Sequence, residues 1–197
     1  MFHYKNLKIS CPEQVYFPRE DSILMAEVLE KVISTNKVSY KQTIEVLEIG
    51  CGSGFLSILA ASLGTQVTAV DINPVAVDTT KQNAKTNNIK LTSLVSDLFS
   101  KVTKKFDLII FNPPYLPNED SKLKGSETWA DSGQIKKFIQ QVSNHLNPSG
   151  TVLLLISSLT QTPVEQLLQQ NNLSFKTIAK KKLPWEELEV LSANKTQ

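Results

Sequence analysis

Cysteine and histidine are scarce in this sequence, with two residues of each among 197. The two cysteines, Cys11 and Cys51, do not follow a metal-ligand spacing and are too few for a disulfide framework. The lack of a disulfide framework favours a reducing, cytoplasmic setting. His3 and His145 stand alone, without a partner pattern, so we expect no metal site in this chain.

Long apolar runs are also missing. The longest, residues 152–156, suits a core strand and is far too short to cross a bilayer. The first residues, 1–5, lack the apolar stretch of a signal peptide. We therefore expect no membrane span and no secretion signal.

An excess of charge of either sign is absent too, because the formal net charge is +2. So small a charge does not attract a polyanion unless basic residues cluster. Lysines do cluster twice, at Lys101, Lys104 and Lys105 and again at residues 180–182. Solvated charge that discourages strand pairing explains both clusters, and a docking surface for an acidic partner is the alternative. We expect no nucleic-acid partner.

Strand-like and helix-like segments alternate along the chain. The length fits one domain, with an N-terminal segment and helix at 1–40 and a core at 41–197. This alternation predicts a mostly parallel, doubly wound α/β sheet, and the last two strands should pair antiparallel because no helix separates them. We expect strands over 44–49, 66–70, 91–95, 106–111, 151–156, 173–179 and 187–192, helices over about 20–34, 55–63, 74–87, 132–146 and 163–170, and irregular structure over 1–19.

The most informative residues are 112–115, Asn-Pro-Pro-Tyr. They follow the apolar run 106–111, which places them at the carboxyl end of a buried strand, where open α/β sheets bind ligands. The Asn112 side-chain oxygen and the Pro113 carbonyl can each accept a hydrogen bond from one planar amino group. The prolines fix φ and hold these acceptors in place, while Tyr115 offers a flat face to an amide or base. An ordinary proline turn is the alternative, but the flanking asparagine and tyrosine favour a substrate site.

A glycine-rich turn, residues 48–54, lies between the first core strand and its helix. Glycine lets the backbone approach a ligand closely and adopt unusual φ angles, and the helix amino terminus presents free N–H groups. The spacing is Gly-x-Gly-x-Gly, with Phe55 where the NAD fingerprint Gly-x-Gly-x-x-Gly has its last glycine. An NAD-dependent dehydrogenase is therefore disfavoured.

Acidic residues end the strands around this turn. Asp71 ends the second core strand, where an acid accepts hydrogen bonds from ribose hydroxyls in dinucleotide folds; a helix-cap aspartate is the alternative. Asp97 ends the third strand and is placed to accept from an adenine amine, with the Leu98 N–H donating to a ring nitrogen, unless Asp97 only forms a turn. Glu48 is expected beside the charged end of the cofactor, where it would balance an ammonium or sulfonium, unless it is only a strand-end residue.

Taken in order, the glycine turn, Asp71, Asp97 and residues 112–115 resemble class I S-adenosylmethionine-dependent methyltransferases that act on planar amino groups. More narrowly, the sequence resembles the HemK-type protein glutamine methyltransferases, on their short archaeal and eukaryotic branch. The resemblance covers nearly the whole chain, and its further segments are 15–22, 71–74, 127–130 and 185–187.

The resemblance implies a seven-stranded Rossmann-like fold, the cofactor S-adenosyl-L-methionine, and methylation of the glutamine side-chain amide in the Gly-Gly-Gln motif of a translation release factor. It also implies a small zinc-binding activator protein as heterodimer partner, covering an apolar sheet edge. The residues that it assigns to the cofactor are Ser22, Glu48, Gly50, Gly52, Gly54, Asp71, Asp97 and Leu98. Those that it assigns to the substrate amide are Asn112, Pro113, Pro114 and Tyr115, with Asn112 also near the methyl donor.

Two departures from the family pattern stand out. The bacterial version carries an extra N-terminal helical domain, whereas only about forty residues precede the glycine strand here, which argues against the bacterial type. The short branch usually shows Trp-Ala-Gly-Gly and a later arginine in its substrate loop. Residues 129–133 instead read Trp-Ala-Asp-Ser-Gly, and no arginine follows.

Other acceptors and functions are compatible with parts of this pattern. The same tetrapeptide serves enzymes that methylate exocyclic amines of adenine or guanine, but these must expose the base and usually carry a recognition domain or basic groove. Lysine methylation is also reported for the branch. A scaffold protein that only binds a partner would have lost site residues, whereas every expected one is present.

Overall fold

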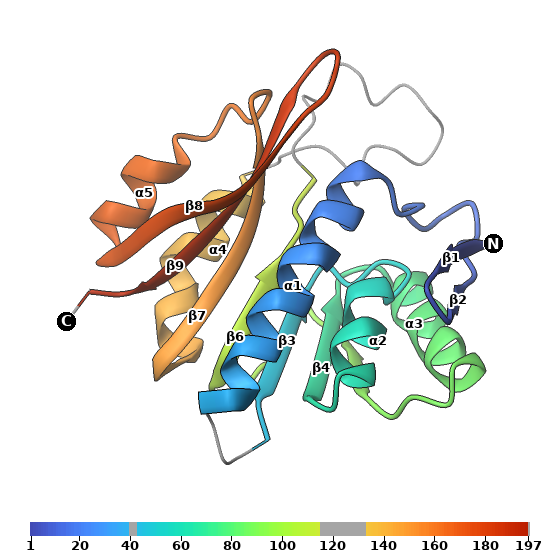
Figure 1. Ribbon diagram of the computed structural model, residues 1–197. Coiled ribbons are helices and arrows are strands. Elements are labelled where there is room, and N and C mark those ends of the chain that lie inside the picture. The colour runs from blue at the N-terminus through green and yellow to red at the C-terminus, as the bar shows by residue number, and fades with distance from the viewer. Residues whose placement is uncertain (40–42, 115–132, 197) are drawn as a thin grey trace.

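The computed structural model describes residues 1–39, 43–114 and 133–196, with the side chains of 36–39 excepted (Figure 1). Within this part, one sheet has the strand order β5-β4-β3-β6-β7-β9-β8. Strands β3 to β7 run parallel, and β9 is antiparallel to both β7 and β8. The predicted seven-stranded, doubly wound α/β fold with an antiparallel C-terminal hairpin is confirmed. The strand bounds are β3 Glu45–Ile49, β4 Gln66–Asp71, β5 Thr92–Val95, β6 Phe106–Phe111, β7 Leu146–Ser157, β8 Leu173–Lys182 and β9 Glu187–Lys195.

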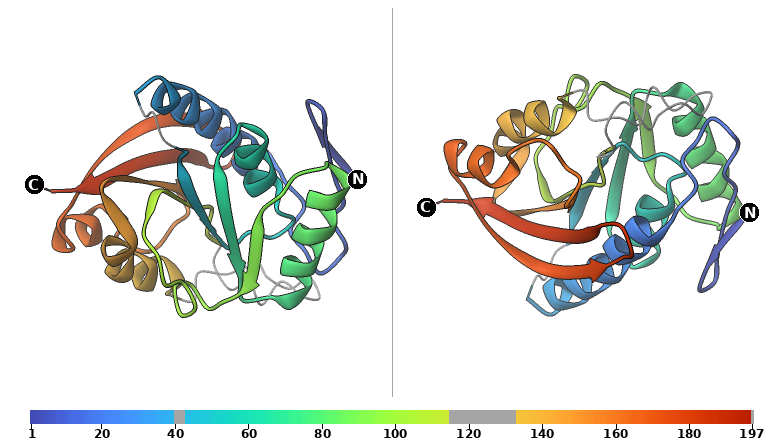
Figure 2. Two further views of the ribbon diagram at one scale, coloured as in Figure 1. Left: turned by 90° about the horizontal axis from the view of Figure 1, so that it is seen from below. Right: turned by 90° about the horizontal axis from the view of Figure 1, so that it is seen from above.

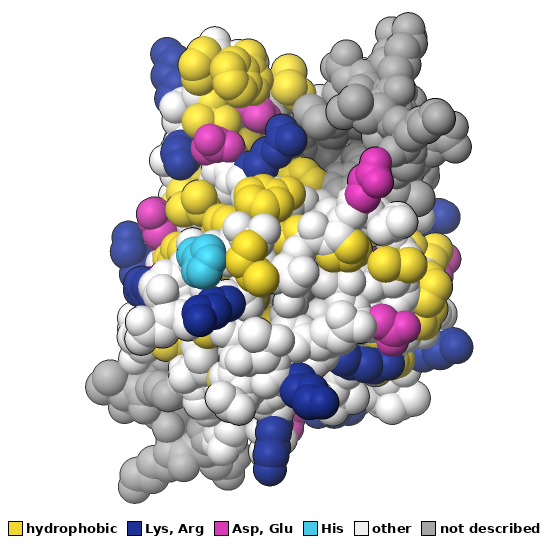
Figure 3. Space-filling model, turned by 90° about the vertical axis from the view of Figure 1, so that its right-hand side faces the viewer, with side chains coloured by type: hydrophobic (Ala, Val, Ile, Leu, Met, Phe, Trp, Pro, Cys, Tyr) yellow, Lys and Arg dark blue, Asp and Glu magenta, His cyan; other side chains and the backbone are white. Residues whose placement is uncertain are grey.

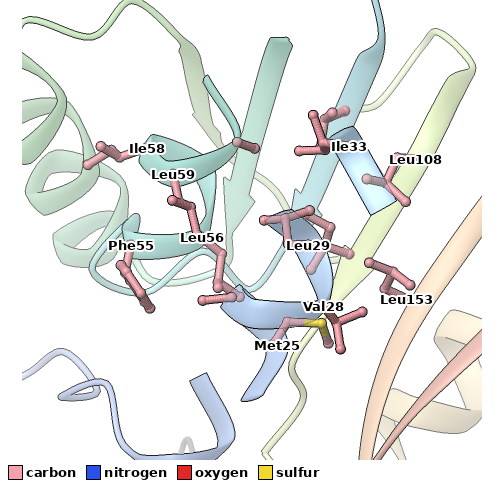
Figure 4. Close-up of a cluster of buried hydrophobic side chains, with 14 of the residues drawn as sticks. Met25, Val28, Leu29, Ile33, Phe55, Leu56, Ile58, Leu59, Leu108 and Leu153 are labelled. Atoms are coloured by element: carbon pink, nitrogen blue, oxygen red, sulfur yellow. The ribbon is translucent and has the colours of Figure 1, made fainter. Parts of the chain in front are cut away.

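Helices cover both faces of this sheet (Figure 2). One face carries α1 and α2, and the opposite face carries α4 and α5, each layer with its own apolar cluster. Figure 4 shows α1 and α2 pointing their apolar side chains toward each other and toward the sheet. The helices contribute Met25, Leu29 and Ile33 of α1 and Leu56 and Leu59 of α2, and the sheet contributes Leu108 of β6 and Leu153 of β7. The helix bounds are α1 Glu20–Ser39, α2 Phe55–Ser62, α3 Pro74–Thr86, α4 Gln134–Val142 and α5 Val164–Gln170. Among the described helices, none has the length and apolar content that crossing a bilayer requires.

The N-terminal residues are more ordered than the sequence predicted. Strands β1 (Phe2–Tyr4) and β2 (Leu7–Ile9) form an antiparallel hairpin, turned at Lys5, whose φ is 51°. The phenylalanine and tyrosine rings of β1 lie edge-on to Phe55 of α2, at centroid distances of 5.0 and 5.1 Å. The expectation of irregular structure over 1–19 was wrong here, because packing against a distant helix stabilises strands too short to show a periodic pattern.

Two asparagines of α3 and its C-terminal cap hold the segment after this hairpin. The Asn83 side chain accepts from the Ser10 N–H and donates to the Ser10 carbonyl, at 2.9 and 2.8 Å. Asn87 does the same for the backbone of Lys8, at 2.9 and 2.8 Å. These four hydrogen bonds fix the backbone of Lys8 and Ser10 against α3.

A second difference concerns strand β7, which begins five residues earlier than predicted. Its pairing with β6 jumps from Phe106↔Leu146 to Leu108↔Thr151, so the residues between bulge out of the ladder. Pro148 lies exposed in this bulge, where its missing N–H breaks no ladder bond. A Cβ on Gly150 would lie 2.8 Å from the Phe106 carbonyl oxygen, which explains the glycine.

The C-terminal hairpin also extends beyond its predicted bounds. Lys180 of β8 forms ion pairs with Glu189 and Glu187 of β9, at 2.7 and 3.6 Å. These ion pairs are exposed, so each stabilises the fold little. They do connect the side chains of the two paired strands. They support the interpretation of this lysine cluster as surface charge that belongs to the hairpin.

Candidate active site

A cavity of about 390 Å³ is lined by residues that follow β3, β4, β5 and β6 and by the segment that leads into α1. The chain winds from β3 outward through β4 and β5 and then returns to β6 on the other side. Such a reversal of strand order is where open α/β sheets bind ligands. The lining includes these residues from the predicted site: Ser22, Glu48, Gly50, Gly52, Asp71, Asp97, Leu98, Asn112, Pro113 and Pro114. Tyr115 and the predicted substrate loop lie outside the described residues.

The glycine turn adopts left-handed backbone angles at each glycine. The φ values are 68° at Gly50, 51° at Gly52 and 77° at Gly54. A Cβ on Gly52 would meet nothing within 4 Å, so the turn leaves open space beside the cavity. Gly54 serves a different purpose, because a Cβ there would lie 2.7 Å from the Thr80 side chain. Gly54 is not among the lining residues and instead permits close packing of α2 against α3.

Replacing Gly54 by alanine is therefore expected to destabilise the fold more than the same change at Gly133. Both residues have a left-handed φ, of 77° and 80°, which costs an alanine about 1–2 kcal/mol. Among the described residues, the added Cβ meets a neighbour at Gly54, namely Thr80, and none at Gly133. Overpacking of this kind adds about 1–3 kcal/mol. Urea unfolding of both variants measures the difference, and equal losses would contradict this account of Gly54.

Asp71 joins the glycine turn to the start of α3. Its Oδ2 accepts from the Gly52 N–H and its Oδ1 accepts from the Asn73 N–H, both at 2.9 Å. The helix cap that was the alternative role of Asp71 belongs to Asn73, whose side chain accepts from the Val75 N–H at 2.9 Å. Burial raises the pKa of Asp71, against the effect of these backbone donors. Each carboxylate oxygen keeps a second lone pair for a ligand hydroxyl.

The turn after β5 is organised by Ser96, which the sequence did not single out. The buried Ser96 hydroxyl donates to the Leu98 carbonyl at 2.9 Å and accepts from the Lys101 N–H at 3.1 Å. Leu98 is held at a φ of 45°, a costly conformation for a side chain of this size, of the kind found at ligand sites. Asp97, between them, is exposed at the cavity.

Glu48 is a buried carboxyl at the cavity wall, 3% exposed. Ser57 of α2 donates its hydroxyl proton to Glu48 Oε2. Burial is the largest cause that raises the pKa of Glu48 to about 8, and the charge of Asp71 acts in the same direction. The ion pairs found in the described ranges do not include Glu48. A buried carboxyl that faces a cavity without a cation fits a ligand that brings its own positive charge.

Glu48 should also make stability depend on pH. Below pH 4.5 the Glu48 carboxyl is protonated in both the folded and the unfolded protein. Between pH 4.5 and about 8 this carboxyl is ionised in the unfolded protein but keeps its proton in the folded one. Stability contributed by Glu48 therefore falls as pH rises through this window. We expect the free energy of unfolding of Glu48→Gln to exceed that of the wild type increasingly up to about pH 8. Denaturant unfolding against pH tests this, with Glu27→Gln on the exposed side of α1 as control, and parallel curves would refute it.

Asn112 is held by Asp21, a residue that the sequence analysis did not single out. Its Nδ2 donates to Asp21 Oδ2 at 2.8 Å, while its Oδ1 is buried and has no partner among the described residues. Asp21 is 3% exposed and also accepts from the Tyr16 hydroxyl and the Ser22 hydroxyl, at 3.1 and 3.3 Å. An acidic residue in the first turn of a helix has an ordinary role, which is to complement the helix dipole. The position of Asp21 within residues 15–22, which carry the family resemblance, was the signal that pointed to the site.

Gln134 is a further lining residue that the sequence did not indicate. It begins α4, lines the cavity, and its buried side-chain oxygen has no hydrogen-bond partner in the described part of the chain. Within the described residues, two residues that line the cavity thus carry a buried side-chain oxygen without a partner, Asn112 after β6 and Gln134 of α4. Both suit a ligand that donates hydrogen bonds.

The family model that matches this chain is the methyltransferase small domain, over residues 24–183. The chain belongs to this methyltransferase family. It is 42% identical to a Methanocaldococcus jannaschii protein named as a protein N5-glutamine methyltransferase, over 96% of this chain and 96% of the relative. It is 31% identical to the human methyltransferase HEMK2, over 92% of this chain and 90% of the relative. The resemblance to HemK-type enzymes of the short branch is confirmed.

Among solved structures, the methyltransferase matches that of the E. cuniculi Mtq2–Trm112 complex, with a TM-score of 0.68 and 19% identity. The match covers 93% of this chain and 99% of that one. At this identity the likeness supports the fold alone. That complex is described as responsible for methylation of the eRF1 translation termination factor.

Proposed function

We propose that this methyltransferase transfers a methyl group from S-adenosyl-L-methionine to the side-chain amide nitrogen of the glutamine in the Gly-Gly-Gln motif of a translation release factor. One observation carries the proposal: Asn112 Oδ1, at the end of β6, is buried and has no hydrogen-bond partner among the residues that the structure describes. A buried acceptor without a partner costs about 1–3 kcal/mol unless a ligand satisfies it, and a planar amino group is its complement. The name of the Methanocaldococcus jannaschii relative supports glutamine as the acceptor.

S-adenosyl-L-methionine is the methyl donor of this family, and the cavity fits it. Three acidic residues of the lining lie at the carboxyl ends of neighbouring strands: Glu48 in β3, Asp71 in β4, and Asp97 just after β5. We assign Asp71 to the ribose hydroxyls, Asp97 and the Leu98 N–H to the adenine, and Glu48 to the positively charged end. Ser22, Gly50 and Gly52 complete the assignment. When bound, the cofactor supplies a methyl group already activated on a sulfonium.

The residues of the chain then have to align and polarise an amide nitrogen. The lone pair of that nitrogen is conjugated with the carbonyl, which makes it a poor nucleophile. Asn112 Oδ1 and the Pro113 carbonyl would each accept one N–H of the amide, so that positive charge developing on nitrogen is stabilised. Because prolines fix the backbone, these acceptors are in place beforehand, and alignment of this kind is worth roughly 7–11 kcal/mol.

The described lining of the cavity also favours an amide over a lysine. A lysine ammonium must lose a proton before it can attack, and that requires a base. The described lining contains no histidine and no lysine, and burial raises the pKa of the Cys51 thiol well above its ordinary range. The buried carboxyl of Glu48 is assigned to the charged end of the cofactor and is not counted as this base. An amide nitrogen needs no such base, since the methylated product can lose its extra proton to water.

A nucleic-acid amine is the second candidate acceptor, and the surface gives it little support. On the face shown in Figure 3, lysine and arginine side chains are spread out, with acidic side chains between them. Together with a net charge of +2, this is a weak footprint for a polyanion. We therefore favour a protein substrate over RNA or DNA. Because translation factors act in the cytoplasm, we also propose that the enzyme acts there.

For the partner, we propose a small zinc-binding activator protein at the β5 edge of the sheet. This edge strand carries Val95, 39% exposed, which pairs with Asp71 of β4. Ile72, which also lines the cavity, and Val75 follow Asp71 in the sequence and are 60% and 40% exposed. Exposed apolar side chains at a free sheet edge are typical of a site covered by another protein. The small partner in the Mtq2–Trm112 complex gives this proposal its precedent.

Incubation with labelled S-adenosyl-L-methionine tests the proposed function. The acceptors are the cognate release factor, the same factor with its Gly-Gly-Gln glutamine replaced by alanine, and total RNA, each with and without the zinc-binding protein. We expect label on the intact factor only, and more of it with the partner present. Undiminished label on the replaced factor would favour lysine, and label on RNA would favour a nucleobase.

A further inference from the structure

The direction of the Asn112 amide is fixed by a residue far away in the sequence. Asp21 lies in the first turn of α1 and contacts the end of β6 through a 2.8 Å bond between its Oδ2 and Asn112 Nδ2. A carboxylate only accepts hydrogen bonds, so the asparagine must present its –NH2 to Asp21. Its Oδ1 then faces away from Asp21; this atom is buried, has no partner in the described part of the chain, and belongs to a residue that lines the cavity.

The carboxylate is itself held in one orientation. Tyr16 and Ser22 both donate to Oδ1 of Asp21, at 3.1 and 3.3 Å, which leaves Oδ2 for Asn112. Every hydrogen bond that the structure shows for the Asp21 side chain is with another side chain, and none is with a helix N–H. The exposed Glu20 beside it is left to complement the dipole of α1.

We propose that Asp21 is a positioning residue that makes this site select amino groups, by holding Asn112 Oδ1 toward the substrate. If the Asn112 amide turned over, its –NH2 would face the –NH2 of the substrate, and two donors would oppose each other. The site would then suit a carboxylate or carbonyl instead. The inference deepens the proposed function and rests on it for the identity of the acceptor.

The substitution Asp21→Asn tests the inference without changing side-chain volume. Because Tyr16 and Ser22 would keep the new Asn oxygen on their side, its Nδ2 would point at Asn112 and force that amide to turn over. We expect turnover to fall roughly 10- to 100-fold, as displacement of a reacting group does, with the cofactor dissociation constant nearly unchanged. Asp78→Asn, at an exposed position on α3, is the matched control and should keep full activity.

Peptide selectivity separates positioning from a merely structural effect. Binding of a Gly-Gly-Gln peptide and of the matching Gly-Gly-Glu peptide is measured with S-adenosylhomocysteine present. The wild type should prefer glutamine, and Asp21→Asn should reduce that preference by roughly tenfold or more. A purely structural role would weaken both peptides equally, which would overturn the proposal.

Two further outcomes are decisive. If Asp21→Asn does not fold, Tyr16→Phe provides a second test, because it removes one donor to Asp21. This variant should lower both turnover and the preference for glutamine. Unchanged values would refute the inference. If the wild type methylates another planar amine instead of the peptide, the proposed function fails. The effect of Asp21→Asn on turnover of that acceptor then decides the role of Asp21 independently.

Discussion

Replacing Asn112 by alanine should abolish measurable methyl transfer while S-adenosyl-L-methionine still binds. The substitution removes the buried acceptor Oδ1 that we assign to the substrate amide, and one lost contact to developing charge costs roughly 10²–10³ in turnover. It also leaves the buried Asp21 without one of its three donors, so part of the loss is in the ordering of the site. Initial rates with saturating acceptor, together with cofactor titration by calorimetry, separate the two effects.

Asn171→Ala is the matched control for this prediction. Asn171 is half-buried at the end of α5, where its Nδ2 donates to the Leu167 carbonyl at 2.8 Å. It does not line the cavity, so its loss should lower stability slightly and leave turnover intact. Near-normal activity in Asn112→Ala would show that the acceptor amide is held by other residues.

Replacing Asp71 by alanine should remove most of the affinity for the cofactor. Two backbone N–H groups, from Gly52 and Asn73, lose their acceptor, and the ribose loses the carboxylate that we assign to it. Hydrogen bonds to charged groups contribute about 1.5–3 kcal/mol each, so the dissociation constant should rise roughly 100-fold or more. Calorimetric titration with S-adenosylhomocysteine measures this directly.

Asp107→Ala controls for the structural part of that loss. Asp107 of β6 also accepts two hydrogen bonds, from the Glu45 N–H at 2.9 Å and from the Asn147 amide at 2.6 Å. It lies outside the cavity, so its replacement should lower the melting temperature without weakening cofactor binding. A similar loss of affinity in both variants would mean that Asp71 acts through the fold and not through the cofactor.

Much of the fold was predictable because its signals are local. The strand β6 and the tetrapeptide after it, the glycine turn before α2, and the Asn73–Pro74 start of α3 each show in a few neighbouring residues. Alternation of strands and helices then leaves few possible topologies. This reasoning predicted that Glu48, Asp71 and Asp97 lie at the carboxyl ends of their strands, and all three line one cavity.

What the sequence could not give depends on contacts between distant segments. The β1–β2 hairpin forms against Phe55 and is followed by residues bound to Asn83 of α3 and to its cap Asn87. The bulge in β7 brings Gly150 close to the Phe106 carbonyl of β6. Asp21 is separated from Asn112 by ninety-one positions, and a carboxylate in a first helical turn has an ordinary explanation already. The close approach of Gly54 to Thr80 could not be foreseen for the same reason, because Thr80 belongs to α3, which follows the next strand.

Tandem mass spectrometry of the release factor after reaction tests the central claim most directly. The cognate factor is incubated with S-adenosyl-L-methionine and either the wild-type enzyme or Asn112→Ala, and the peptide that contains Gly-Gly-Gln is sequenced. The account predicts one added methyl group on the glutamine side chain with the wild type and none with the variant. A methyl group on a lysine, or an unmodified factor in a mixture where RNA is methylated, would contradict it.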